Sequence, residues 1–447
     1  MPRPSKRART RQQAKAARSA ASAKPAAAPA QKPAQSLWSR LGPGLITGAA
    51  DDDPSGIATY SQVGAGFGYS ILWTTLFTFP LMVGIQTVSA RIGRVTGHGL
   101  AANIRSYYPR PILYGVVLLL LVANTINIAA DIGAMGAAMA LLIGGNAHWY
   151  GAAFGILSVV LQVFIPFPRY APILKALTLA LLAYVASLFI IEIPWGEVAF
   201  GTLMPKLSLT SEYIVAVVAV FGTTISPYLF FWQSSQEVED EEADPEAGPL
   251  KEHPEQANRE LNRIGWETWV GMAMSNLIAF FIILTTAVTL HANGQTDIQT
   301  AEQAAEALRP IAGDLAFLLF SLGLIGTGLL AVPVLAGSVA YAVGEARGWH
   351  IGLERPLNEA RPFYVVIALA ILVGVGLGFT PLDPIRALLW SAVVNGVIVV
   401  PIMVAMMIMA SRRSLMGRFV ASRWQVLLGW SATAVMTAAA IAMFATM

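Results

Sequence analysis

The sequence predicts an all-α polytopic membrane protein, built as a five-plus-five inverted repeat with broken first and sixth helices. Three observations predict this fold: few charged residues, apolar runs long enough to cross a bilayer, and two interrupted runs in corresponding positions. Of 447 residues, 55% are hydrophobic and 12% are charged, whereas soluble domains carry about 25% charged residues. The runs do not alternate with polar residues, so they fit helices rather than the strands of a barrel.

About eleven transmembrane helices are expected, because a hydrocarbon core of about 30 Å needs roughly 20 apolar residues. They are predicted at 41–69 (interrupted), 71–90, 111–142, 150–167, 171–192, 213–235 (interrupted), 268–291, 311–345, 363–380, 385–410 and 425–446. Basic residues gather after the even-numbered spans, which places the N-terminus in the cytoplasm and the C-terminus outside. We therefore expect a multi-pass protein of the cell (plasma or inner) membrane, surrounded by the lipid bilayer.

Four segments are predicted along the chain. Residues 1–36 hold nine Lys and Arg and no acidic residue, which predicts a disordered basic cytoplasmic tail. The first five-helix repeat is expected at 37–192, the second at 213–410, and an additional eleventh helix at 425–446.

An acidic stretch, EVEDEEADPEAGPLKEHPEQ, interrupts the second repeat. We predict a solvated cytoplasmic loop at 237–267 that contains a short helix near 255–265. The alternative interpretation is an antechamber that attracts metal ions.

Proline breaks two of the predicted spans beside polar residues. The first reads AADDDPSGIAT and the sixth reads FGTTISPYLF. Proline removes one backbone hydrogen bond and crowds the carbonyl four residues earlier, so the carbonyls of Ala50 and Thr223 lose their helical partners. Five spans separate the two breaks, which is the pattern of an inverted repeat with a binding site at the bilayer midplane.

A cation is the expected partner of the first break. An intramembrane carboxylate costs several kcal/mol unless it is paired or hydrated, and neither broken span contains Lys or Arg. The predicted ligands are all oxygens: the Asp53 carboxylate, the Ala50 and Thr223 carbonyls, and the hydroxyls of Thr223, Thr224 and Ser226. This set suits hard divalent ions such as Mg²⁺, Ca²⁺ or Mn²⁺. The chain has no Cys and no nucleophile–base set, so we predict neither a thiolate site nor an enzyme.

Four segments of the sequence resemble the Nramp family of divalent-metal transporters. They are DDDPSG, ARIGRVTGHGLA (90–101), AADIGAMGAAMAL (129–141) and the break at 222–228. The resemblance implies a LeuT-type inverted-repeat fold and transport of Mn²⁺ and Fe²⁺ together with protons. It places the family's metal-binding Asp at Asp53 and its proton-path Asp at Asp131.

Several other family positions are changed here. The family's metal-binding Asn falls on Gly56, its soft Met ligand on Ser226, its His on Tyr228, and its carbonyl-donating Ala on Thr223. The Glu partner of the proton path is Ala134. With these changes, the sequence resembles the Nramp-related magnesium transporter branch.

We therefore predict a secondary-type transporter for Mg²⁺ and Mn²⁺ that works by alternating access without proton coupling. Gly56 and Ser226 remove bulk and a soft sulfur, which favours a partly hydrated hard ion. An inside-negative potential drives a divalent ion inward by about 4.6 kcal/mol per 100 mV. One alternative is a conventional proton-coupled Mn²⁺/Fe²⁺ symporter, and an alternative of another class is a non-transporting membrane metal sensor.

Further polar residues are assigned to the outer sphere of the ion or to its pathway. Asp51 and Asp52 are outer-sphere ligands, a cation funnel or a helix cap; Asp131 is a buried polar relay or keeps a proton role. Tyr228 and Asn395 are pathway candidates. The side chains of Asn124, Asn127 and Asn276 either line the pathway or bridge helices. The expected protein is a monomer that binds no nucleic acid and no cofactor beyond the transported ion.

Overall fold

A computed structural model describes residues 42–165, 169, 179–187, 189–353, 355–380 and 383–447, and these residues contain helices and no strand. The α-helices are α2 (Pro43–Asp51), α3 (Pro54–Phe67), α4 (Trp73–Thr96), α5 (Leu100–Tyr107), α6 (Arg110–Ile143), α7 (Ala147–Phe164), α9 (Leu182–Ser187), α10 (Trp195–Leu203), α11 (Ser211–Thr224), α12 (Pro227–Ala243), α13 (Ala257–Thr289), α14 (Ala301–Ala305), α15 (Arg309–Ala312), α16 (Ala316–Arg347), α17 (Arg361–Leu377), α18 (Pro384–Ala410), α19 (Arg413–Met416) and α20 (Arg423–Thr446). Short 3₁₀ helices are η2 (Gly68–Ile71), η3 (Leu179–Leu181), η4 (Pro254–Gln256), η5 (His291–Asn293), η6 (Glu306–Leu308) and η7 (Gly313–Leu315).

The predicted spans correspond to the long helices. Within the described ranges, 8 helices are long and apolar enough to cross a membrane, and α17 is a shorter apolar helix. The first and sixth predicted spans are each divided into two helices, α2 with α3 and α11 with α12. In the fifth predicted span, 171–192, residues 171–178 and 188 lie outside the described residues, and the described part contains the short helices η3 and α9. The basic tail at 1–36 lies wholly outside the described residues. The boundaries of the two repeats stay predictions.

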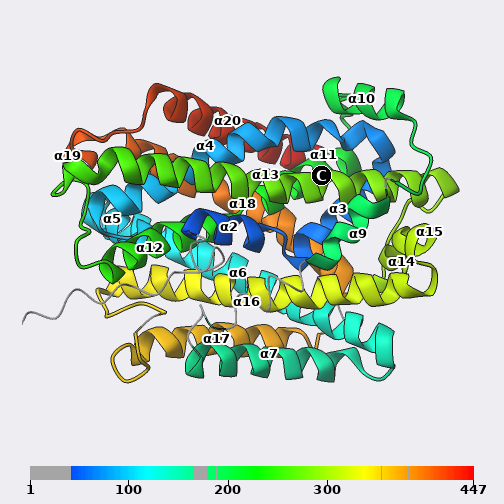
Figure 1. Cartoon of the computed structure of the whole chain (residues 1–447), viewed down its shortest axis with the longest axis horizontal. Coiled ribbons are helices and arrows are strands. Elements are labelled where there is room, and N and C mark those ends of the chain that lie inside the picture. The colour runs from blue at the N-terminus through cyan, green and yellow to red at the C-terminus, as the bar shows by residue number, and fades with distance from the viewer. Residues whose placement is uncertain (1–41, 166–168, 170–178, 188, 354, 381–382) are drawn as a thin grey trace, which may run out of the picture. The chain divides into compact units, whose positions relative to one another are not determined.

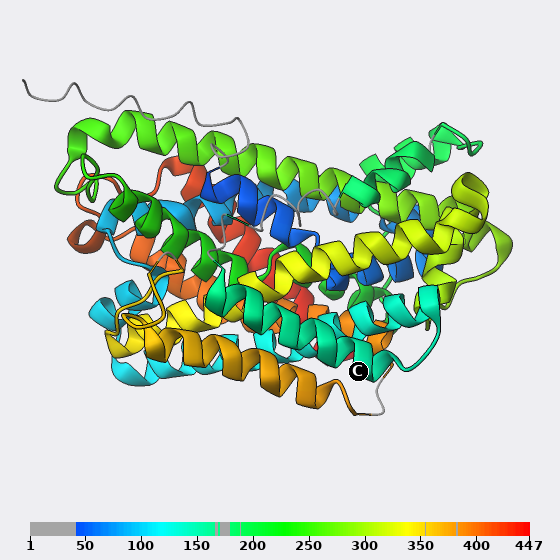
Figure 2. The same cartoon turned by 60° about the horizontal axis from the view of Figure 1, so that its bottom comes forward.

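The two halves of the first broken helix lie in the middle of the bundle. Figure 1 shows α2 and α3 between the long helices α13 and α16, with α7 and α17 side by side beyond α16. In both views α2 runs along α13 (Figure 2). The site region is therefore surrounded by helices that are nearly continuous, while its own helices are interrupted.

Glycines allow α2 to pack backbone to backbone against α13. A Cβ atom on Gly48 would lie 2.3 Å from the carbonyl carbon of Gly271, and one on Gly271 would lie 2.5 Å from the carbonyl oxygen of Gly44. Small residues at such spacing are typical of close helix pairs in membranes. This packing fixes the position of the α2 C-terminus, where the acidic residues begin.

Only the middle of the acidic stretch is the loop that we predicted, because both ends of 237–267 are helical. Helix α12 continues to Ala243 and α13 begins at Ala257, so the segment between them is much shorter than 237–267. Glu237, Glu241 and Glu260 are buried. The helices continue through these residues because arginines neutralise the acids. The run of acidic residues in the sequence did not reveal this pairing.

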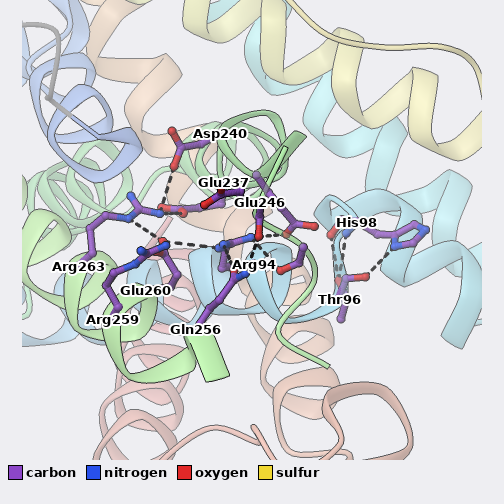
Figure 3. Close-up of polar contacts among 12 residues, drawn as sticks. Arg94, Thr96, His98, Glu237, Asp240, Glu246, Gln256, Arg259, Glu260 and Arg263 are labelled. Atoms are coloured by element: carbon purple, nitrogen blue, oxygen red, sulfur yellow. Dashed lines mark hydrogen bonds and ion pairs between the residues drawn. The ribbon is translucent and has the colours of Figure 1, made fainter. Parts of the chain in front are cut away.

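Two arginines hold the acids in one network (Figure 3). Arg94 of α4, 2% exposed, binds Glu241 at 2.6 Å and lies 3.7 Å from Glu260. Arg263 of α13 binds Glu237 at 2.6 Å and Glu260 at 3.0 Å. The network joins α4, α12 and α13 at the predicted cytoplasmic ends of these helices.

Replacing Gly48 by Ala should destabilise the protein. The added methyl would clash with the α13 backbone, and overpacking of this kind costs about 1–3 kcal/mol. Gly115→Ala is the matched control, because a Cβ atom there meets nothing within 4 Å. Thermal unfolding in detergent should show a lower transition temperature for Gly48→Ala only; equal temperatures for the two variants would contradict the packing.

Replacing Arg263 by Met should destabilise the C-terminal end of α12 and the N-terminal end of α13. The change leaves Glu237 buried without its cation, and such a loss costs about 3–5 kcal/mol. Arg259→Met is the control, because Arg259 is 72% exposed and contacts only Glu260 among the ion pairs of the described residues; exposed pairs contribute about 0–1 kcal/mol. Thermal unfolding that does not distinguish the two variants would refute a structural role for the network.

Candidate functional site

The first break is formed by two helix ends that meet at acidic residues. Asp51 is the last residue of α2 and Asp52 is its C-cap. Asp53 is the N-cap of α3, where its Oδ1 accepts a hydrogen bond of 2.7 Å from the Gly56 amide. Pro54 follows at the first helical position, where its missing N–H needs no partner. One short segment thus ends one helix and begins the next.

The second break has the same arrangement. Helix α11 ends at Thr224, and Ser226 is the N-cap of α12 with Pro227 at its first position. The Ser226 hydroxyl lies 2.8 Å from both the Gly222 and the Thr223 carbonyl oxygens, and it can donate its single hydrogen to either of them. The carbonyl that proline frees at Thr223 therefore has a side-chain partner in this structure.

The structure brings the two breaks into direct contact. The Ser55 and Thr223 hydroxyls are 3.3 Å apart, and Tyr228 donates a hydrogen bond of 3.0 Å to the Ala50 carbonyl. The predicted carbonyls of Ala50 and Thr223 have thus lost their helical partners, but they are not vacant. An ion that used either carbonyl would have to share it with a hydroxyl or displace that hydroxyl.

Thr224 belongs to the same contact between the breaks. Its hydroxyl donates to the Val220 carbonyl at 2.6 Å and lies 3.2 Å from the Tyr60 hydroxyl. Because its single hydrogen is used, Tyr60 is the donor between the two hydroxyls. The Thr224 oxygen therefore serves as an acceptor between α3 and α11.

Asp53 has more hydrogen-bond partners than any other acid of the first break. Its Oδ2 accepts a hydrogen bond of 3.1 Å from the side-chain amide of Asn127 on α6, and it lies 3.4 Å from the Tyr228 hydroxyl. The side-chain oxygen of Asn127 in turn accepts a hydrogen bond of 2.8 Å from the Ser391 hydroxyl of α18. Asp53 is 2% exposed, so these bonds hold a buried carboxylate in one orientation between four helices.

Gly56 lies at the point where the two breaks are nearest. A Cβ atom there would be 3.3 Å from the Tyr60 ring and 3.4 Å from the Thr223 hydroxyl. The room that we expected at this position is therefore bordered closely by two side chains. A residue of the size of Asn would require both of them to move.

Four predicted residues lie close to these contacts without joining them. Asp131 is fully buried one turn beyond Asn127 on α6, and neither of its oxygens has a hydrogen-bond partner among the described residues. Asn395, one turn beyond Ser391 on α18, is 1% exposed and its two amide atoms also lack partners there. Asp51 and Asp52 both contact Ser275 of α13 instead of facing α11.

Sequence reasoning missed two residues of this region, Ser275 and Ser391, and left the role of Asn127 open. Asn127 was predicted to line the pathway or to bridge helices, and in the structure it bridges Asp53 and Ser391. Ser275 and Ser391 gave no signal, because single serines are ordinary in apolar helices. Among the described residues no three His, Asp or Glu side chains gather closely enough to hold a metal by themselves.

The family of the chain follows from comparison with known proteins. A family model described as natural resistance-associated macrophage protein-like, or Nramp, matches residues 44–446. The chain belongs to the Nramp family. A relative in Klebsiella pneumoniae, the divalent metal cation transporter MntH, is 29% identical over 406 residues, which cover 88% of this chain and 91% of that protein.

Solved structures support the predicted fold. A manganese transporter of Eremococcus coleocola superposes with a TM-score of 0.69 at 16% identity, over 92% of this chain and 88% of that one. The nucleobase-cation-symport-1 transporter Mhp1 superposes with a TM-score of 0.55 at 14% identity, over 91% and 92% of the two chains. The LeuT-type fold of this Nramp protein is therefore confirmed.

Proposed function

We propose that this Nramp protein carries hard divalent cations, Mg²⁺ and Mn²⁺, across the membrane by alternating access and without obligatory proton coupling. Its family and the name of its Klebsiella relative support divalent metal transport. The observation that carries the choice of ion is the oxygen-rich contact between the two breaks, where Ser226 occupies the position of the family's soft ligand. Asp53 would supply the charge, and a partly hydrated ion would complete its shell with water.

The contacts at Asp53 support its role as the carboxylate of this site. Asn127 and Tyr228 orient its Oδ2 from two other helices, and an oriented carboxylate binds an ion with little loss of side-chain freedom. The Thr223, Thr224 and Ser226 oxygens lie on the facing break. In a LeuT-type fold, rocking of one helix bundle against the other would expose such a site to each side in turn.

A conventional proton-coupled symporter remains the second candidate because of Asp131. This carboxyl group is fully buried and has no hydrogen-bond partner among the described residues. A buried acid without a partner is suited to hold a proton. The family's Glu partner is Ala134 here, which favours transport without that proton path.

Replacing Asp53 by Asn should abolish most of the Mg²⁺ and Mn²⁺ flux into proteoliposomes. Asn still caps α3 but removes the charge, so we expect a fall of about tenfold or more, which corresponds to about 1.4 kcal/mol. Asp383→Asn is the control, since Asp383 caps α18 in the same way, by accepting from the Ile385 and Arg386 amides. A pH-sensitive dye inside the liposomes should report no metal-driven acidification.

Several outcomes would refute the proposal in the form given. A wild-type protein that passes no Mg²⁺, or that needs a proton gradient to do so, contradicts it. Full flux through Asp53→Asn would remove Asp53 from the site. Metal-driven acidification of the lumen would establish the symporter instead.

Replacing Ser226 by Met should shift selectivity toward softer ions. The thioether adds a ligand that favours Mn²⁺ or Cd²⁺ over Mg²⁺, so excess Mg²⁺ should inhibit Mn²⁺ uptake several-fold less. Ser226→Ala is the matched control, because it loses the same bonds to Gly222 and Thr223 without adding sulfur. If both variants respond to Mg²⁺ alike, the side chain at this position does not set selectivity.

A further inference from the structure

The three aspartates of the first break have very different surroundings. Asp53 lies at the N-terminus of α3, where the helix dipole favours a negative charge, and it accepts hydrogen bonds from Gly56 and Asn127. Asp51 and Asp52 lie at the C-terminus of α2, where the dipole favours a positive charge instead. The fold therefore compensates the third carboxylate but not the first two.

A single hydroxyl serves both of these carboxylates. Ser275 Oγ contacts Asp51 Oδ2 and lies 3.0 Å from Asp52 Oδ1. A hydroxyl has one hydrogen, so it donates to one carboxylate at a time. The Asp51 side chain is fully buried, and its Oδ1 has no hydrogen-bond partner among the described residues. The two buried acids thus share one hydroxyl donor, which is fewer donors than a single buried carboxylate needs.

Among the described residues, no arginine or lysine forms an ion pair with either carboxylate. Asp51 and Asp52 are absent from the ion pairs of the described residues, and Asp52 is only 5% exposed. A carboxylate buried in this way is charged only beside a counter-ion and otherwise holds a proton, because removing a bare charge from water is very costly. No ion pair of the described residues provides that counter-ion, so a cation that keeps both carboxylates charged has to come from outside the chain.

The helix packing holds this group in place. The close approach of Gly48 to Gly271 fixes α2 against α13 one turn before Ser275. Two carboxylates and a hydroxyl therefore converge from two rigid helices, as a binding site requires. The convergence lies on the α13 side of the break, whereas the Asp53 Oδ2 atom faces α6 and α12.

We propose that Asp51, Asp52 and Ser275 form a second site for a hard divalent cation, beside the site at Asp53. One or two carboxylates with the remaining positions filled by water are the usual ligands of Mg²⁺, and the α2 C-terminus adds further negative potential. An ion held here neutralises the two carboxylates that the fold leaves uncompensated. The proposal rests on the proposed function, which it extends from one ion to two.

The number of Mn²⁺ ions bound per protein tests the second site. Mn²⁺ is titrated into the purified full-length protein in detergent, and free Mn²⁺ is measured by electron paramagnetic resonance. We expect two ions for the wild type, one for the double variant Asp51→Asn with Asp52→Asn, and one for Asp53→Asn. A wild type that binds one ion, or a double variant that still binds two, would overturn the proposal.

Ser275→Ala gives a second, milder test that keeps all the carboxylates. It should weaken one of the two sites about tenfold and leave the other unchanged. Ser158→Ala is the control, because Ser158 is equally buried but lies on α7. Equal affinities of Ser275→Ala and wild type at both sites would contradict the assignment of Ser275.

Flux separates this proposal from the proposed function. Two bound ions without Mg²⁺ or Mn²⁺ transport would leave the second site standing and refute the transporter. Normal transport by a wild type that binds one ion would leave the transporter standing and refute the second site.

Discussion

The hydrogen bonds that the two helix breaks supply to each other are the constraint on which the site depends. In hydrocarbon, backbone groups need partners inside the protein, and each proline removes one. Tyr228 of the sixth helix provides a partner for Ala50 of the first, while Ser226 provides one for Thr223 within its own break. The breaks are therefore tolerated as a pair, and the same hydroxyls and carbonyls surround Asp53.

Helix ends divide the acids of the first break into two kinds. Asp53 begins a helix and is held by amide and hydroxyl donors from several directions, so the protein itself stabilises its charge. Asp51 and Asp52 end a helix and share one serine, so the second site that we propose there would keep them charged by binding a cation from solution. Three adjacent residues of the same type thus have different chemistry, because the negative end of the α2 dipole lies at the first two and the positive end of the α3 dipole lies at the third.

Buried acids where α12 ends and α13 begins are neutralised by arginines of the chain itself. Glu237 and Glu241 are as deeply placed as many core residues, but Arg263 and Arg94 pair with them. The first part of the acidic segment therefore belongs to helix α12 and its last part to α13, and residues 244–256 connect the two helices. An acid-rich stretch is usually predicted to be exposed to solvent. That prediction fails here because the arginines that pair with the acids are distant in the sequence.

The sequence by itself determined the membrane class, the long helices, the positions of both breaks and the family, because apolar length and proline act locally. It also predicted Asp53 as a ligand, since an acid beside a proline in an apolar run is conspicuous. Only the tertiary structure decided that the freed carbonyls are hydrogen-bonded, that Asn127 orients Asp53, and that Ser275 joins Asp51 to Asp52. These contacts join residues far apart in the chain, and their geometry depends on how closely glycines let the helices approach.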